Sequence, residues 1–85
     1  MIDVDLGREI RQFIVEAFAF GDESALVSDD TSLLESRVLD STDVLELIVF
    51  VEGRFGIKVE DDEVVPENFD SVNKVRDFVT RKLGR

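Results

Sequence analysis

Residues 38–47 read Val38-Leu39-Asp40-Ser41-Thr42-Asp43-Val44-Leu45-Glu46-Leu47, and they join a polar turn to the most apolar helical pattern in the chain. Asp40 or Ser41 can cap the helix that begins here, because each side chain carries an oxygen able to accept from a free backbone N–H of the first turn. Asp43 adds negative charge at the positive end of the helix dipole. The pattern therefore puts Ser41 at a helix start, at the edge of the solvent, between acidic side chains.

The apolar spacing predicts that this helix runs from Ser41 to about Phe55. Its expected buried stripe consists of Val44, Leu47, Ile48, Val51 and Phe55. Leu45 and Val49 fall outside the stripe and either pack under the preceding loop or form an exposed apolar pair bordered by acids. An apolar centre with a charged rim is typical of a protein contact site. On the second interpretation we define a recognition surface, made of Asp40, Asp43, Leu45, Glu46, Val49 and Glu52.

An earlier helix is predicted from about Asp5 to Phe18, with Asp3 or Asp5 as its cap and Gly21 as a stop signal. Val15 lies outside the apolar stripe expected to face the core. The members of that stripe are Leu6, Ile10, Phe13, Ile14, Ala17 and Phe18.

The connection from Asp22 to Leu39 is long for a compact domain, and loops of this length are often functional. Residues 28–31, Ser-Asp-Asp-Thr, are typical of a turn. Parts of the connection must pack over the helices, because it contains too many apolar residues to leave in water. These are Leu26, Val27, Leu33, Leu34, Val38 and Leu39.

The C-terminal part predicts a short helical segment over Glu60–Val65, stopped by Pro66, and a last helix capped by Ser71 that runs to about Leu83. The buried stripe of the last helix is expected to be Val72, Val75, Phe78, Val79 and Leu83. No strand pattern is convincing. The chain is therefore expected to be all-α: a small antiparallel four-helix bundle of three main helices and one short helix, with a long loop between the first and second.

The composition limits the possible functions. The 85 residues suffice for a single domain, residues 1–85, and contain neither Cys nor His, so disulfides, thiolate metal sites and the usual general base are excluded. Twenty acidic residues against ten basic ones give a net charge of −10, which disfavours nucleic acid and favours partners with basic patches. The acids of residues 60–63 fit no calcium-binding loop, so no metal site is expected.

No signal peptide or membrane span is recognisable, since the N-terminus is acidic and the longest apolar run is Leu47–Val51. We expect a cytoplasmic, monomeric protein. A chain with its own start and end also suggests a free-standing protein and not a domain cut from a larger synthase.

The central motif and its surroundings resemble the acyl carrier protein family. An Asp-Ser pair at a helix start, followed by an acidic and apolar helix that ends in Phe-Gly-Ile, is the strongest part of the resemblance. The matching segments are 33–36, 38–47, 50–52, 54–57, 61–63 and 66–72. Two positions depart from the common pattern: Thr42 stands where many members have Leu, and Arg37 with Val38 where many have Gly.

The resemblance implies that Ser41 receives 4′-phosphopantetheine from coenzyme A, transferred by a separate Mg²⁺-dependent phosphopantetheinyl transferase. The arm's thiol would carry acyl or aminoacyl groups as thioesters, so the chain would be a carrier and not an enzyme. Its further partners would be enzymes that load and process these groups, docking on the second helix. The bundle interior is expected to shelter an apolar acyl chain, lined by Phe13, Leu47, Ile48, Val51, Phe78 and Val79.

A simpler interpretation remains open for the same residues. Ser is an ordinary capping residue, so Ser41 can be a helix cap and nothing more. The chain would then be a noncatalytic, acidic helical module for protein interaction. Charge reversal on the acidic helix does not distinguish the two interpretations, because both predict that it weakens partner binding. Modification of Ser41 does distinguish them.

Overall fold

The computed structural model describes the backbone of residues 2–84 and the side chains of residues 6–84, and within that part it contains helices and no strand. The elements are α1 (Ile2–Phe18), the 3₁₀ turn η1 (Glu23–Ala25), α2 (Asp43–Phe55), the 3₁₀ turn η2 (Asp61–Glu63), α3 (Pro66–Phe69) and α4 (Val72–Lys82). The predicted all-α class is confirmed, with three main helices and one short one.

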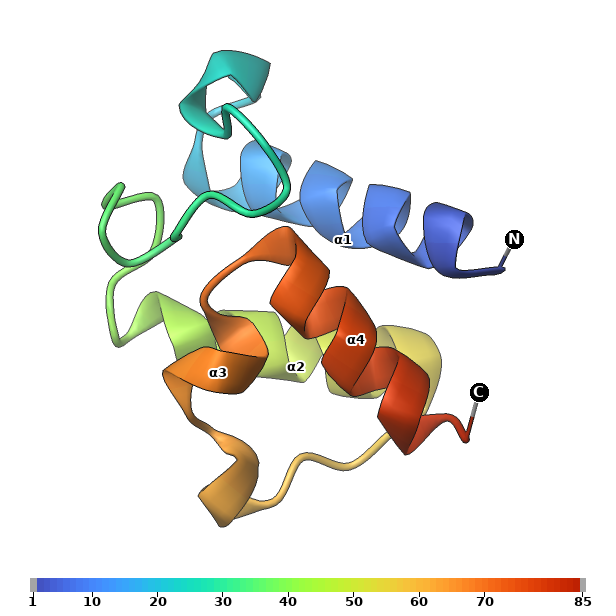
Figure 1. Ribbon diagram of the computed structural model, residues 1–85. Helices are drawn as coiled ribbons and strands as arrows, with labels where there is room; N and C mark the ends of the chain where they lie inside the picture. Colours follow the sequence, from blue (N-terminus) through green and yellow to red (C-terminus); the bar gives the residue numbers. More distant parts are fainter. Residues whose placement is uncertain (1, 85) are drawn as a thin grey trace.

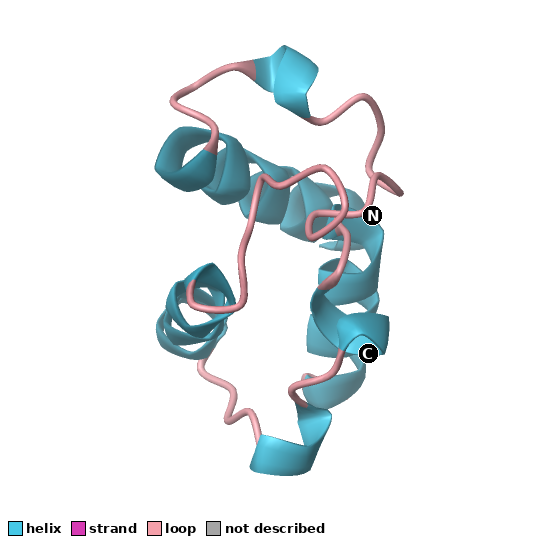
Figure 2. Ribbon diagram, turned by 90° about the vertical axis from the view of Figure 1, so that its left-hand side faces the viewer, coloured by secondary structure: helices cyan, strands magenta, loops and turns pink. Residues whose placement is uncertain are grey.

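The helices surround one apolar core. α4 packs against α1 and α3, and α2 packs against α1 while running in the opposite direction (Figure 1). The connection between α1 and α2 loops over one end of the bundle (Figure 2). No helix in the described part of the chain is long and apolar enough to cross a membrane.

α1 begins earlier than predicted, at Ile2, and ends at Phe18 as expected. The proposed capping side chains, Asp3 and Asp5, lie outside the described ones. Val15 is buried and Ala17 is exposed, so the predicted stripe was wrong at these two positions. Val15 lies four residues after Arg11, on the side of α1 where Arg11 binds the connection, and this second packing surface buries it.

The connection is held to the bundle at two separate places. In its first half, Arg11 donates to the carbonyl of Leu26 at 2.7 Å and forms ion pairs with Glu23 and Asp29. In its second half, Asp70 accepts from the connection through both carboxylate oxygens. The turn at residues 28–31 is confirmed by a Thr31 N–H to Ser28 carbonyl bond of 3.2 Å.

The apolar residues of the connection divide between core and solvent. Leu26, Leu33 and Leu39 are buried, whereas Val27 is 89% exposed. The expectation that parts of the connection pack over the helices is confirmed. The buried leucines fix the path of the backbone as it approaches Ser41.

The short helix differs from the prediction. Residues 61–63 form only a single 3₁₀ turn, and Pro66 begins α3 instead of stopping a helix. Proline is favoured in the first turn of a helix, because its missing N–H would have no partner there. Val65 before it is extended, with φ −136° and ψ 155°, as the residue before a proline prefers to be.

The caps of the other helices agree with the sequence. The Ser71 Oγ accepts from the Lys74 N–H at 3.1 Å and caps α4, as predicted. Gly56 ends α2 with φ 69°, a left-handed conformation that glycine adopts without strain. These two caps set the ends of the helices on either side of α3.

Candidate functional site

The start of α2 is capped by a pair of aspartates. The Asp43 N–H donates to Asp40 Oδ1 at 2.8 Å, and the Asp40 N–H donates to Asp43 Oδ2 at 3.2 Å. Each carboxylate thus satisfies a backbone donor of the first turn, in the manner of a capping box. The sequence left Asp40 and Ser41 as alternatives for this cap. Thr42 is the residue immediately before α2 and makes no capping bond with its side chain, and Asp40, two residues earlier, supplies the capping carboxylate instead.

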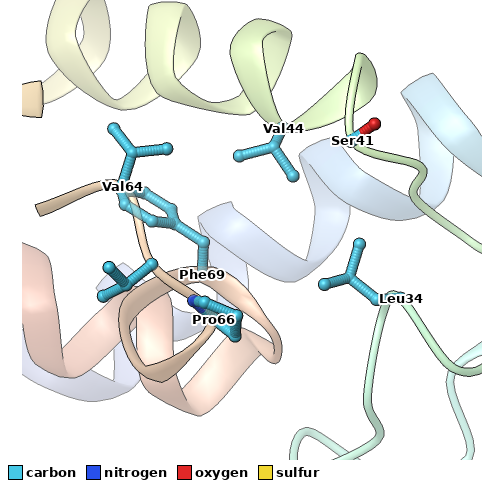
Figure 3. A pocket seen from close by; sticks show the side chains of 7 residues that line it. Leu34, Ser41, Val44, Val64, Pro66 and Phe69 are labelled. Carbon is cyan, nitrogen blue, oxygen red and sulfur yellow. The ribbon is translucent and has the colours of Figure 1, made fainter.

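The hydroxyl of Ser41 stabilises no other group among the described residues. Ser41 lies in the turn that leads into α2, where the Val44 N–H donates to the Asp40 carbonyl at 3.3 Å. Its side chain is exposed, and no hydrogen bond within residues 2–84 involves its Oγ. Figure 3 shows the Ser41 oxygen turned away from the apolar side chains nearby. The site therefore offers an accessible hydroxyl at the start of a helix.

An apolar pocket of about 180 Å³ adjoins Ser41. It lies between α2, the end of the connection and the segment around α3 (Figure 3). Apart from Ser41 its lining residues are all apolar: Leu34, Val44, Val64, Val65, Pro66 and Phe69. None of them belongs to the lining that the sequence predicted. Leu47, Val51 and Val79 from that set are fully buried core residues.

Asp70 positions the backbone that leads to Ser41. Its carboxylate accepts from Ser32 Oγ at 2.8 Å and from the Leu34 N–H at 2.9 Å, and its carbonyl accepts from the Leu33 N–H at 2.8 Å. The Leu39 N–H then donates to the Leu33 carbonyl at 3.0 Å. This role could not be predicted from the sequence, because an Asp beside the capping Ser71 is typical of any helix start.

The apolar centre of the predicted recognition surface is exposed. Leu45 is 60% exposed and Val49 is 68% exposed, so the alternative in which they pack under the connection is wrong. Glu46 is exposed beside them. The Glu52 carboxylate accepts from the Val59 N–H at 2.8 Å and thus also supports the segment after α2. A role for all six residues in partner binding stays a prediction.

No metal centre is apparent near Ser41. The described residues contain no group of three or more Asp or Glu side chains that could hold a metal ion. The sequence also lacks His and Cys. Neither an imidazole nor a thiolate of this chain can therefore activate the Ser41 hydroxyl.

Arg37 holds a left-handed backbone conformation, with φ 64°, four residues before Ser41. A residue with a Cβ atom costs about 1–2 kcal/mol of stability in this conformation. Glycine avoids that cost, but it loses more backbone entropy on folding, and this loss cancels part of the gain. We expect Arg37→Gly to raise the free energy of unfolding by about 0.5–1 kcal/mol, measured by urea titration. Glu35→Gly, at a neighbouring position without positive φ, should lower it. A loss of stability in Arg37→Gly would show that the arginine side chain makes a stabilising contact.

Comparison with known proteins gives matches over most of the chain. A D-alanyl carrier protein of Streptococcus sanguinis is 35% identical over 77 residues, which cover 91% of this chain and 94% of that protein. An acyl carrier protein of Thermotoga maritima is 28% identical over 64 residues, or 75% of this chain and 76% of that protein. An acyl carrier protein of Campylobacter hominis is 27% identical over 77 residues, or 91% and 89%. No model of a known protein family matches the chain.

Proposed function

Because this chain belongs to the acyl carrier protein family, we propose that Ser41 bears a 4′-phosphopantetheine arm on which the protein carries acyl or aminoacyl groups. The relatives are named for two kinds of cargo, D-alanyl and acyl groups. In this proposal the chain performs no chemistry itself and is modified and used by partner enzymes in the cytoplasm.

The observation that carries the proposal is the free hydroxyl of Ser41. Asp40 caps α2, so Ser41 is not needed for that purpose. Its Oγ is exposed and makes no hydrogen bond within the described residues, which leaves it open to a transferase that uses coenzyme A and Mg²⁺. When attached, the arm supplies a terminal thiol that holds the cargo as a thioester, in a chain without cysteine.

The pocket beside Ser41 favours an apolar cargo. Its volume is about 180 Å³, and its walls are aliphatic and aromatic apart from Ser41. An apolar cavity of about 150 Å³ is large enough to bind benzene, so this pocket has room for a group of about six carbons. We propose that short apolar acyl chains bind here, between α2 and α3, and not in the closely packed interior.

The acidic character of α2 supports recognition by enzymes with basic patches. The acids of the recognition surface would raise the rate of encounter, and the exposed pair Leu45 and Val49 would prolong the complex. The transferase that modifies Ser41 would be the first such partner. Enzymes that load or process the cargo would follow on the same surface.

The proposal is tested by loading the unmodified protein with coenzyme A, Mg²⁺ and a promiscuous phosphopantetheinyl transferase. We expect the intact mass to rise by one phosphopantetheine group. A thiol reagent should titrate no thiol before the reaction and one thiol per chain after it, because the sequence has no cysteine. Peptide mass analysis should place the group on Ser41.

The opposite result favours the interaction module. If protein confirmed to be unmodified gains neither mass nor thiol, while a control carrier protein reacts in the same mixture, Ser41 is not an attachment site for this enzyme class. A gain of mass on another residue would contradict the site assignment while leaving the carrier function intact.

A further inference from the structure

One side of the Ser41 pocket is built by a single short segment. Most of its apolar lining residues lie within residues 63–69, which we call the wall segment: Val64, Val65, Pro66 and Phe69. Figure 3 shows Pro66 on the opposite side of the pocket from Val44 of α2. α3 lies within the wall segment and packs against α4 more extensively than against α2. The position of the wall segment relative to α2 therefore depends on α4.

Two cations in the last turn of α4 bind polar groups of the wall segment. Lys82 Nζ donates to both carboxylate oxygens of Glu63, at 2.9 and 3.2 Å. Arg81 donates to Asn68 Oδ1 at 3.0 Å, and Asn68 in turn donates to the Glu63 carbonyl at 2.8 Å. The side chains of Lys82 and Glu63 are only 26% and 28% exposed, so solvent screens their ion pair less than a pair at the open surface. We call these four residues the Lys82 network.

The two ends of the wall segment are held differently. Phe69, at its C-terminal end, is buried and packs against Phe78 of α4 with ring centroids 5.1 Å apart. Val64 and Val65, near its N-terminal end, are 38% and 36% exposed, and residues 57–60 before them form no helix. Core packing therefore fixes the Phe69 end, whereas the Val64 end depends on the Lys82 network.

We infer, on the basis of the proposed carrier function, that the ion pair of Lys82 and Glu63 sets an upper limit on the length of the acyl chain that the Ser41 pocket accepts. While the pair holds the Val64 end of the wall segment in place, the pocket keeps its volume of about 180 Å³ and admits about six carbons. A longer chain enters fully only by displacing the wall segment, which breaks the pair. Lys82 is thus a positioning residue that acts on the cargo through Glu63.

The test uses the unmodified whole chain and straight-chain alcohols of about four to ten carbons as probes, so the result does not depend on the arm. Dissociation constants are measured from the chemical-shift changes of Leu34 and Val64. In the wild type we expect affinity to rise about fourfold for each added methylene up to about six carbons and then to level off, because further carbons stay in water. In Lys82→Met affinity should keep rising, so that the longest alcohol binds at least about tenfold more tightly than it binds the wild type.

Three further variants separate the ion pair from other effects of the substitution. Lys82→Arg keeps a cation beside Glu63 and should keep the limit near six carbons. Lys74→Met removes the same charge from α4 at an exposed side chain without a partner among the described residues, and it should change every affinity less than about twofold. Glu63→Gln breaks the pair from the other side while retaining an oxygen for the Glu60 N–H, so it should raise the limit even if Lys82→Met does not fold.

Three results would overturn the inference. The first is an unchanged limit on chain length in the folded variants that break the pair. The second is a loss of affinity by the same factor for every chain length, which a merely structural role of Lys82 predicts. The third is a set of shift changes centred outside the Ser41 pocket. Attachment of the arm to Ser41 is measured by mass on the same variants, so failure of this inference and failure of the carrier function are recorded separately.

Discussion

Ser41→Ala is expected to abolish attachment of the arm while leaving the free energy of unfolding within about 0.5 kcal/mol of wild type. The loss is complete because the proposed bond forms at Ser41 Oγ. Stability is spared because that oxygen is exposed and makes no hydrogen bond within residues 2–84. A serine that capped α2 would behave differently, since removing such a cap costs about 1 kcal/mol.

Asp40→Ala is the matched control and should show the reverse pattern. It removes the carboxylate that accepts from the Asp43 N–H at 2.8 Å, so we expect a loss of about 1 kcal/mol of stability. The variant retains Ser41 and should still accept the arm when the reaction is run to completion, although the rate is expected to fall because Asp40 belongs to the recognition surface. Urea titration and intact mass, measured on both variants, give the two readouts. A marked loss of stability in Ser41→Ala would restore the interpretation of Ser41 as a cap.

The helical framework could be predicted because apolar spacing reports directly on burial. Leu47, Ile48 and Val51 are buried in α2 as expected, whereas Val44 and Phe55, predicted to be buried with them, are only partly buried at the edge of the core. Ser71 was identified as the cap of the last helix from its side-chain chemistry alone. These features are local, because each depends on residues within one or two helical turns of one another.

The errors arose where a distant segment changes a local pattern. Val15 is buried because the connection packs on the Arg11 side of α1. The apolar spacing within α1 alone cannot predict that this second side of the helix is covered. Pro66 is compatible both with the end of one helix and with the beginning of the next. Only the path of residues 61–69 decides between these possibilities.

The candidate site shows the same division between local and distant causes. The sequence placed Ser41 at a helix start, but three-dimensional geometry was needed to give the cap to Asp40 and to expose Leu45 and Val49. The pocket beside Ser41 joins Leu34 to residues 64–69, a juxtaposition made by the fold. α2 consequently presents the pocket beside its N-terminal end and the exposed pair Leu45 and Val49 farther along the helix, so on the proposed function cargo and partner would not compete for one surface.

Asp70→Ala and Arg11→Ala are expected to destabilise the protein to a similar extent, by about 2 kcal/mol each, yet to differ in their effect on Ser41. Asp70→Ala leaves Ser32 Oγ and the Leu34 N–H without their acceptor. Arg11→Ala removes a guanidinium that binds Glu23, Asp29 and the Leu26 carbonyl. The first change loosens the half of the connection that leads to Ser41, and the second loosens the half next to α1.

Only Asp70→Ala should slow modification of Ser41. We expect kcat/KM of the transferase to fall at least about fivefold for Asp70→Ala and to change less than about twofold for Arg11→Ala, because small displacements of a reacting group are costly. Both rates must be measured where circular dichroism shows the variants folded. Hydrogen exchange should show lost protection at the Leu34 N–H in Asp70→Ala alone. Equal rates for the two variants would mean that Ser41 is positioned by the cap of α2 and its burial contacts, without help from Asp70.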